Sequence, residues 1–140
     1  MTQDSTLAFA HQLADAARSV VVPYFGTRLE MVRKEDDSPV TCADREAERR
    51  MRDLITTTYP EHGILGEEFG EEGADRKNVW VLDPIDGTKS FITGRPLFGT
   101  LIALTCDGVP VLGVADMPIL DRRWSALAGE QSFNDGVPCA

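Results

Sequence analysis

The sequence predicts an α+β domain in which two N-terminal helices form a layer on a mostly antiparallel sheet. Two early segments carry apolar residues that recur at helical spacing. From Ile64 onward, short apolar runs alternate with glycine, proline and aspartate turns, as is typical of strands. The chain of 140 residues suits one domain with a real core. Helices followed by strands indicate a helical layer on a sheet.

Composition and charge exclude several classes of partner. Hydrophobic residues make up 42% of the chain and charged residues 26%, as in ordinary globular proteins. The formal net charge of −9 argues against a nucleic-acid surface or an anionic membrane as partner. No segment approaches transmembrane length, and the N-terminus has neither a basic region nor a continuous apolar run. Cys42, Cys106 and Cys139 form no Cys-x-x-Cys pair, so we expect a reducing compartment and a cytoplasmic protein.

The first predicted helix begins near Asp4 or Ser5, either of which is a candidate N-cap, and ends at Pro23 and Gly26. His11 lies close to its apolar stripe, and its sequence neighbours offer it no partner. We interpret it as a boundary packing residue. The apolar residues at helical spacing are Leu7, Ala10, Leu13, Ala14, Ala17, Val20 and Val21.

A charged connection over residues 33–39 leads to the second predicted helix, which should end by Tyr59 and Pro60. Thr41 and Asp44 fit a Thr-x-x-Asp capping pattern, and on the residues alone capping is the favoured role of Asp44. The apolar face consists of Ala43, Ala47, Met51, Leu54 and Ile55.

A short strand is predicted at Ile64 and Leu65, after which Gly66 releases the chain into a run of glutamates. Adjacent glutamates are usually surface charge, and this is the first interpretation of Glu67 and Glu68. The histidine of the preceding Pro-Glu-His-Gly turn, His62, is expected to face solvent.

The stretch from Trp80 to Gly94 contains the main candidate functional residues. An apolar run from Val79 to Leu82 predicts a strand that delivers Asp83, and Pro84 should end it because proline cannot donate to a sheet ladder. The chain should turn at the next Asp-Gly pair and begin a short helix over residues 88–92.

Asp83 and Asp86 lie three positions apart on this turn and can converge on one hard cation. The N–H groups of Gly87, Thr88 and Lys89 would face the same space and can hold an anion. Taken alone, Asp-x-x-Asp-Gly is more often a solvated turn. Carboxylates that can bind a metal beside amides that can bind a phosphate indicate metal-assisted phosphate chemistry.

The remaining chain predicts a β-meander. The strand over residues 99–106 is apolar on both faces, so both faces should be covered. Asp107 and Gly108 form a hairpin turn that leads into a return strand from Val109 to Met117. After a turn at residues 118–121, a third strand is expected from Arg123 to Ala128.

The stretch Trp-Val-Leu-Asp-Pro-Ile-Asp-Gly-Thr over residues 80–88 resembles the signature of the inositol-monophosphatase family of magnesium-dependent, lithium-sensitive phosphomonoesterases. Ser-Pro-Val-Thr-Cys-Ala-Asp at 38–44 and Gly-Glu-Glu at 66–68 resemble two further blocks of that family, in the usual order. The segments 91–104 and 118–124 look most like its histidinol-phosphatase branch. The resemblance implies the first half of an αβαβα fold.

The resemblance also implies a ligand set for two or three Mg²⁺ ions per complete site. Glu67 and Asp83 would bind one ion together with the carbonyl oxygen of Ile85. Asp83 and Asp86 would bind a second. This assignment replaces the surface-charge interpretation of Glu67.

The same resemblance implies catalytic and substrate-binding roles. Asp44 would pair with Thr88, whose hydroxyl orients a water molecule, and Glu67 would help to hold that water. The amides of Gly87 and Thr88 would hold the phosphate.

The implied function is hydrolysis of a small phosphorylated alcohol, with histidinol phosphate of histidine biosynthesis as the favoured substrate. Inositol 1-phosphate and a nucleotide 3′,5′-bisphosphate are the alternatives. A different class is a non-catalytic metal- or phosphate-binding fragment. Since the family's proteins have about twice this length, we expect residues 1–140 to be the metal- and phosphate-binding catalytic domain and the substrate domain to be absent. The family forms homodimers, and apolar surface left by the absent half is expected to favour self-association.

Overall fold

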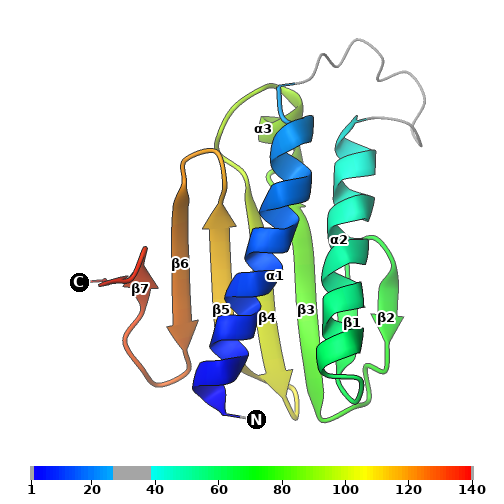
Figure 1. The fold of residues 1–140 in the computed structure, drawn as a ribbon, viewed down its shortest axis with the longest axis vertical. Helices are drawn as coiled ribbons and strands as arrows, with labels where there is room; N and C mark the ends of the chain where they lie inside the picture. The colour runs from blue at the N-terminus through cyan, green and yellow to red at the C-terminus, as the bar shows by residue number, and fades with distance from the viewer. Residues whose placement is uncertain (1, 27–38, 140) are drawn as a thin grey trace.

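The computed structural model describes residues 2–26 and 39–139. Two long helices lie side by side on one face of a sheet, and a short helix lies at one end of it (Figure 1). The predicted α+β class is confirmed, whereas most of the charged connection over residues 33–39 lies outside the described residues. The helices are α1 (Gln3–Tyr24), α2 (Pro39–Thr58) and α3 (Thr88–Ile92), and the strands are β1 (Gly63–Gly66), β2 (Gly70–Glu72), β3 (Asn78–Asp86), β4 (Gly99–Cys106), β5 (Val109–Met117), β6 (Arg122–Leu127), β7 (Phe133–Asn134) and β8 (Val137–Pro138).

The strands form one sheet in the order β2-β1-β3-β4-β5-β6-β7-β8. β1 pairs with β3 in parallel, and the other neighbouring strands pair antiparallel, so the prediction of a mostly antiparallel sheet is confirmed. Asp107 and Gly108 have φ angles of 51° and 81°, as a tight hairpin between β4 and β5 requires.

The first helix begins earlier than predicted. Thr2 is the N-cap of α1: its hydroxyl accepts the Ser5 N–H at 3.1 Å, and the Ser5 side chain bonds back to the Thr2 backbone. The assignment of Asp4 or Ser5 as N-cap is therefore wrong by two or three residues. Pro23 lies inside the last turn, and the Phe25 N–H closes that turn on the Val21 carbonyl.

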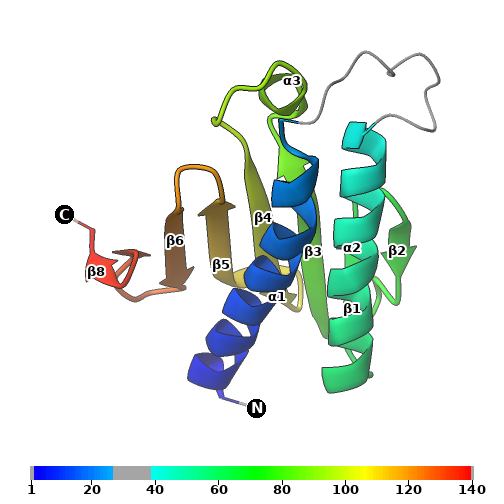
Figure 2. The same ribbon diagram turned by 45° about the horizontal axis from the view of Figure 1, so that its top comes forward.

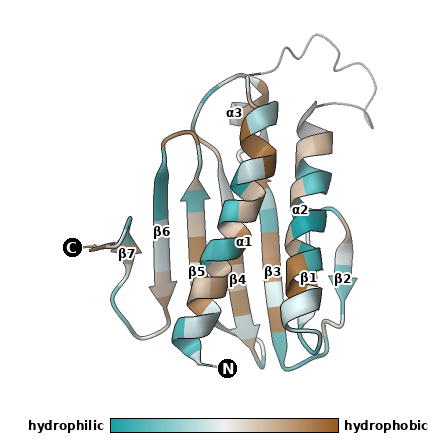
Figure 3. Cartoon of the chain, in the orientation of Figure 1, coloured by the Kyte–Doolittle hydropathy of each residue, from teal (hydrophilic) through white to brown (hydrophobic). Residues whose placement is uncertain are grey.

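The apolar face of α2 is buried as predicted, with Ala43, Ala47, Met51 and Ile55 all 0% exposed. The helix begins at Pro39, so Thr41 lies inside its first turn and the capping interpretation of Thr41 and Asp44 is wrong. α2 contacts β3, while α1 contacts β4 and β5. Apolar and polar residues alternate along both helices in Figure 3, which is the pattern of a layer with one face on a sheet.

The helices cover one face of the sheet, as the turned view in Figure 2 also shows. On β4, Ile102 and Leu104 are 2% exposed, whereas Leu101 between Thr100 and Ile102 is 38% exposed. The prediction that this strand is covered on both faces is therefore wrong within the described residues, because no described helix packs on the second face.

Strand β3 continues past Pro84, contrary to prediction. Asp83 pairs with Leu101 and Asp86 with Gly99, so the register shifts between them in a β-bulge. Pro84 lies in this bulge, where its missing N–H removes no ladder bond, and its carbonyl accepts the Thr100 hydroxyl at 2.8 Å. The bulge changes the direction of the chain just before α3.

His62 is buried and does not face solvent as predicted. It is 4% exposed, its Nδ1 accepts the Trp80 indole N–H at 3.0 Å, and its ring stacks on Tyr59 at a centroid distance of 4.5 Å. Burial lowers the pKa of His62, while the charge of Glu61 opposes that shift. Among residues 2–26 and 39–139, no helix is both long and apolar enough to cross a membrane.

Candidate metal and phosphate site

The parallel pairing of β1 with β3 places two of the predicted ligands at one edge of the sheet. Gly66 pairs with Leu82 in the ladder, so the next residues, Glu67 just after β1 and Asp83 within β3, lie at the same level of the sheet. The Glu67 side chain lies close enough to raise the pKa of Asp83, by hydrogen bonding and by its charge. Two segments distant in sequence therefore bring their carboxyl groups into contact.

Asp83 is electrostatically unusual. Burial raises its pKa to about 7, helped by the hydrogen bond and charge of Glu67 and by the charge of Asp86, while the Ile85 backbone hydrogen bond opposes the shift. Its Oδ1 atom is buried without a hydrogen-bond partner in the described structure. A buried acceptor without a donor is costly and is a position that a cation can satisfy.

Asp44 belongs to the same acidic cluster. It lies on α2 and is 9% exposed, and burial raises its pKa to about 8, with additional effects from the charges of Glu68, Asp83, Glu67 and Glu48. Its Oδ1 atom is likewise buried without a partner in the described structure. Thr88 is exposed at the first position of α3, and its pairing with Asp44 stays a prediction.

The turn after β3 has the shape that the sequence predicts. Gly87 precedes α3 in the left-handed region, with φ 95° and ψ 44°. A Cβ atom there would lie 3.0 Å from the Leu97 carbonyl oxygen and 3.2 Å from Phe98 Cβ, so glycine is required twice over. α3 is anchored by Phe91, which is 2% exposed and packs edge-on against Phe98 at 5.1 Å.

The donor chemistry of this edge fits a hard divalent cation. Carboxylate oxygens with a nearby backbone carbonyl are the ligands that Mg²⁺ prefers. Among residues 2–26 and 39–139, no group of three His, Cys, Asp or Glu side chains is already drawn together as a metal-ligand set. Glu67 and Asp83 form the closely associated pair, and Asp86 is exposed but close enough to affect the pKa of Asp83.

One site residue has no counterpart in the sequence prediction. Glu48 is 0% exposed, and its carboxylate accepts the backbone N–H groups of Glu68 and Phe69, both at 2.9 Å. Its position four residues after Asp44, on the buried face of α2, is the sequence signal that could have found it. The neighbour Glu68, left uncertain by the sequence, has a raised pKa, caused by burial and then by the charges of Glu48 and Glu67.

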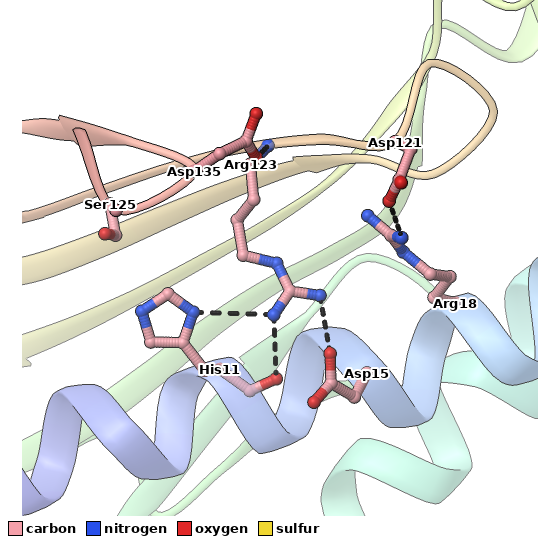
Figure 4. Close-up of a pocket in the computed structure, with 8 residues that line it drawn as sticks. His11, Asp15, Arg18, Asp121, Arg123, Ser125 and Asp135 are labelled. Carbon is pink, nitrogen blue, oxygen red and sulfur yellow. Dashed lines mark hydrogen bonds and ion pairs between the residues drawn. The ribbon is translucent and has the colours of Figure 1, made fainter. Parts of the chain in front are cut away.

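A separate pocket of about 330 Å³ lies between α1 and β6 and contains none of the predicted site residues (Figure 4). Arg123 donates to Asp15 at 2.7 Å and contacts His11 Nδ1 at 3.4 Å. His11 is half-buried, as a boundary residue should be, and its partner is 112 residues away and so is not one of its sequence neighbours. Burial, and then the charge of Arg123, lowers the pKa of His11.

The cations of this pocket are already matched by acids. Arg18 donates to Asp121 at 2.6 Å, and Arg18 and Arg123 both donate to Asp116, at 2.7 and 2.9 Å. Asp116 is 0% exposed. Paired guanidinium groups are poor receptors for a phosphate, so the acidic edge remains the candidate site.

The chain was compared with known proteins. A family model described as "Inositol monophosphatase family" matches residues 2–140. The histidinol-phosphatase of Chlorobaculum parvum is 44% identical over 99% of this chain and 53% of its own length. The bifunctional phosphatase IMPL2 of Arabidopsis thaliana is 50% identical over 95% of this chain and 39% of its own. Inositol-1-monophosphatase ImpA of Mycolicibacterium smegmatis is 39% identical over 95% of this chain and 48% of its own.

Solved structures agree with these sequence relatives. An inositol monophosphatase from Zymomonas mobilis superimposes with a TM-score of 0.89 at 43% identity, over 99% of this chain and 53% of that one. The chain spans about half the length of the curated relatives it matches. By sequence and by structure, the chain belongs to the inositol monophosphatase family.

Proposed function

We propose that this chain provides the metal- and phosphate-binding part of a magnesium-dependent phosphoric monoester hydrolase. The single observation that carries the proposal is the closeness of the Glu67 and Asp83 side chains, which the parallel register of β1 and β3 produces. Asp83 lies four residues before Gly87, where the turn into α3 begins, so a cation site and an anion site would share one edge of the sheet.

In this proposal Glu67, Asp83 and the Ile85 carbonyl hold one Mg²⁺, and Asp83 and Asp86 hold a second. When bound, the ions lower the pKa of a water molecule and neutralise charge on the phosphate ester. The raised pKa of Asp83, about 7, supports the proposal because proton and cation compete for the same oxygens.

The chain's own residues have three further tasks. The Thr88 hydroxyl, paired with Asp44, orients the attacking water, and Glu67 contributes a second oxygen to its position. The amides of Gly87 and Thr88 lack partner carbonyls within α3 and hold the phosphoryl oxygens in line for attack. The fixed left-handed turn at Gly87 supports this role because it sets the direction of those amides before substrate binds.

The favoured substrate is histidinol phosphate, since relatives in Chlorobaculum parvum and Mycobacterium tuberculosis bear the name histidinol-phosphatase at 44% identity. Inositol 1-phosphate is the main alternative, supported by the name of the Mycolicibacterium smegmatis relative. A nucleotide 3′,5′-bisphosphate is a third. A cytoplasmic location and homodimer formation belong to the same proposal.

A function of another class is a non-catalytic metal- or phosphate-binding module. The chain spans about half the length of these relatives, so the activity of a whole relative is a proposal for this chain, and the module is its alternative.

Two measurements separate these functions. Calorimetric titration with Mg²⁺ tests the cation site, and phosphate release from histidinol phosphate, inositol 1-phosphate and a 3′,5′-bisphosphate tests turnover. We expect Asp83→Asn to abolish Mg²⁺ binding and phosphate release together, because Asp83 contacts both proposed ions, and Asp107→Asn in the distant hairpin to preserve both. Mg²⁺ binding without turnover supports the module. Near-normal activity of Asp83→Asn would show that the assigned ligands are wrong.

A further inference from the structure

A buried carboxylate holds the turn between β1 and β2. The Glu48 side chain on α2 is 0% exposed, and its two oxygens accept the backbone N–H groups of Glu68 and Phe69, each at 2.9 Å. Glu67 is the residue directly before these two amides. The backbone on the C-terminal side of Glu67 is therefore bonded to a neighbouring helix.

Arg52 completes this arrangement from the next turn of α2. Its Nε atom donates to Glu48 Oε2 at 2.9 Å, and its Nη2 atom donates to the Gly70 carbonyl at the start of β2. Its side chain is 13% exposed, and its guanidinium lies 5.9 Å from the Phe69 ring centroid. Arg52 therefore pairs with Glu48 and bonds to the same turn that Glu48 holds.

The absence of a side chain at Gly66 makes room for this carboxylate. A Cβ atom on Gly66 would lie within 2.6 Å of both Glu48 oxygens, so the carboxylate rests directly on the glycine. Gly66 itself is fixed by the ladder to Leu82. The backbone is therefore held on both sides of Glu67, and only the Glu67 side-chain torsions remain free.

We infer that Glu48 is a positioning residue: it fixes the turn from Gly66 to Gly70 and thereby presents the Glu67 carboxyl group to Asp83. The inference rests on the proposed function, because it gives Glu67 a ligand role. A ligand whose backbone is already ordered loses less entropy when a cation binds. Partners that orient metal ligands in this way typically change metal affinity by about 10- to 100-fold when removed.

The test compares Glu48→Gln with Asp53→Asn, which removes one acidic charge from an exposed position of the same helix. The Gln side chain keeps one acceptor oxygen and places an amide NH₂ group where the second oxygen was. Without metal, we expect amide hydrogen exchange of Glu68 or Phe69 to become roughly tenfold faster in Glu48→Gln. By calorimetry, we expect Mg²⁺ to bind about 10- to 100-fold more weakly. Asp53→Asn should change neither quantity.

Unchanged exchange at both amides would overturn the inference, and so would faster exchange with unaltered Mg²⁺ affinity. If the unsubstituted chain binds no Mg²⁺, the proposed function fails instead. The positioning role is then decided without metal by the ¹³C chemical shift of the Glu67 carboxyl carbon. A shift that moves in Glu48→Gln and not in Asp53→Asn supports the role, and one that stays in place refutes it.

Arg52→Lys provides a second variant if Glu48→Gln does not fold. It keeps the positive charge but cannot bond to Glu48 and to the Gly70 carbonyl with one planar group. We expect faster amide hydrogen exchange and weaker Mg²⁺ binding in Arg52→Lys, both to a smaller extent than in Glu48→Gln. An Arg52→Lys variant with a normal melting temperature and unaltered exchange and Mg²⁺ affinity would contradict the inference.

Discussion

At the scale of single residues, two buried polar side chains depend on each other. The indole N–H of Trp80, a residue that is 0% exposed, reaches His62 Nδ1 at 3.0 Å. That bond requires the neutral imidazole with its proton on Nε2, which agrees with the lowered pKa of His62. A buried donor of this kind cannot turn to water if its acceptor is removed.

We predict that His62→Phe lowers the free energy of unfolding by about 1–3 kcal/mol, because the Trp80 N–H loses its acceptor while the apolar volume is kept. Urea denaturation followed by tryptophan fluorescence measures the change. Glu61→Gln is the matched control, since it alters only an exposed charge 3.7 Å from the same ring. Equal stability of His62→Phe and the unsubstituted chain would show that this bond contributes nothing.

At the scale of secondary-structure elements, an ion-pair network connects α1 to the far strands of the sheet. Asp116 on β5 accepts from Arg18 on α1 and from Arg123 on β6, and it is 0% exposed. Asp121 in the following turn also bonds to Arg18, but its side chain is 85% exposed. One arginine therefore has a buried and an exposed partner.

We predict that Asp116→Asn destabilises the fold by about 3–5 kcal/mol, because two partly buried guanidinium groups lose their buried charged partner and keep only exposed ones. Asp121→Asn removes an equally short bond to Arg18 but should cost no more than about 1 kcal/mol, since water replaces it. The urea concentrations at which Asp116→Asn and Asp121→Asn are half unfolded measure this difference in stability. The network would have no structural role if both variants unfolded at the same urea concentration.

The elements whose form is decided locally could be predicted from the sequence. The short helix after Gly87 has the predicted bounds, and so does the strand from Val109 to Met117, because turn residues and apolar spacing specify them. The prediction that the strand ends at Pro84 is wrong because a β-bulge can accommodate a proline within a strand. The partners of His11 and His62 depend on chain segments that only the folded topology brings near, and no local pattern reveals them.

In the candidate site, too, some residues are placed by local sequence and others by the folded topology. Asp83, Asp86 and the turn at Gly87 stand together in one motif, so their placement follows from adjacent residues. The contact between Glu67 and Asp83 depends on the register of β1 against β3, which the resemblance implies and the residues alone do not. Glu48 requires both that register and the packing of α2.

At the scale of the whole molecule, the acidic cluster couples folding to pH. The folded-state pKa values of Asp83 and Asp44 are raised to about 7 and about 8, so the folded chain holds protons that the unfolded chain has released. The resulting stabilisation is fully present at low pH and is lost as pH rises through these values. The pKa values of His11 and His62 are lowered, so their effect on stability has the opposite sign, and it has ended by pH about 7.5, where both are neutral in either state.

We predict that the melting temperature of the metal-free chain falls between pH about 6.5 and about 8.5. Added Mg²⁺ should raise it more at the higher pH, where the carboxylates are free to bind the cation. Differential scanning calorimetry at constant ionic strength measures both effects, and Asp44→Asn combined with Asp83→Asn should flatten the profile. A melting temperature that rises with pH in the absence of metal contradicts the prediction.

The parallel pair of β1 and β3 also decides where this chain can change length. Beyond β2, the segment between the two strands includes the exposed residues Ala74 and Asp75, and extra residues there leave the alignment of Gly66 with Leu82 untouched. An insertion beside Ile64 or Leu65 would slide Glu67 by about 3.3 Å along the sheet edge and turn its side chain to the opposite face. Changes of length are therefore tolerated beyond β2, while the four residues of β1 and the turn that Glu48 holds must keep their number.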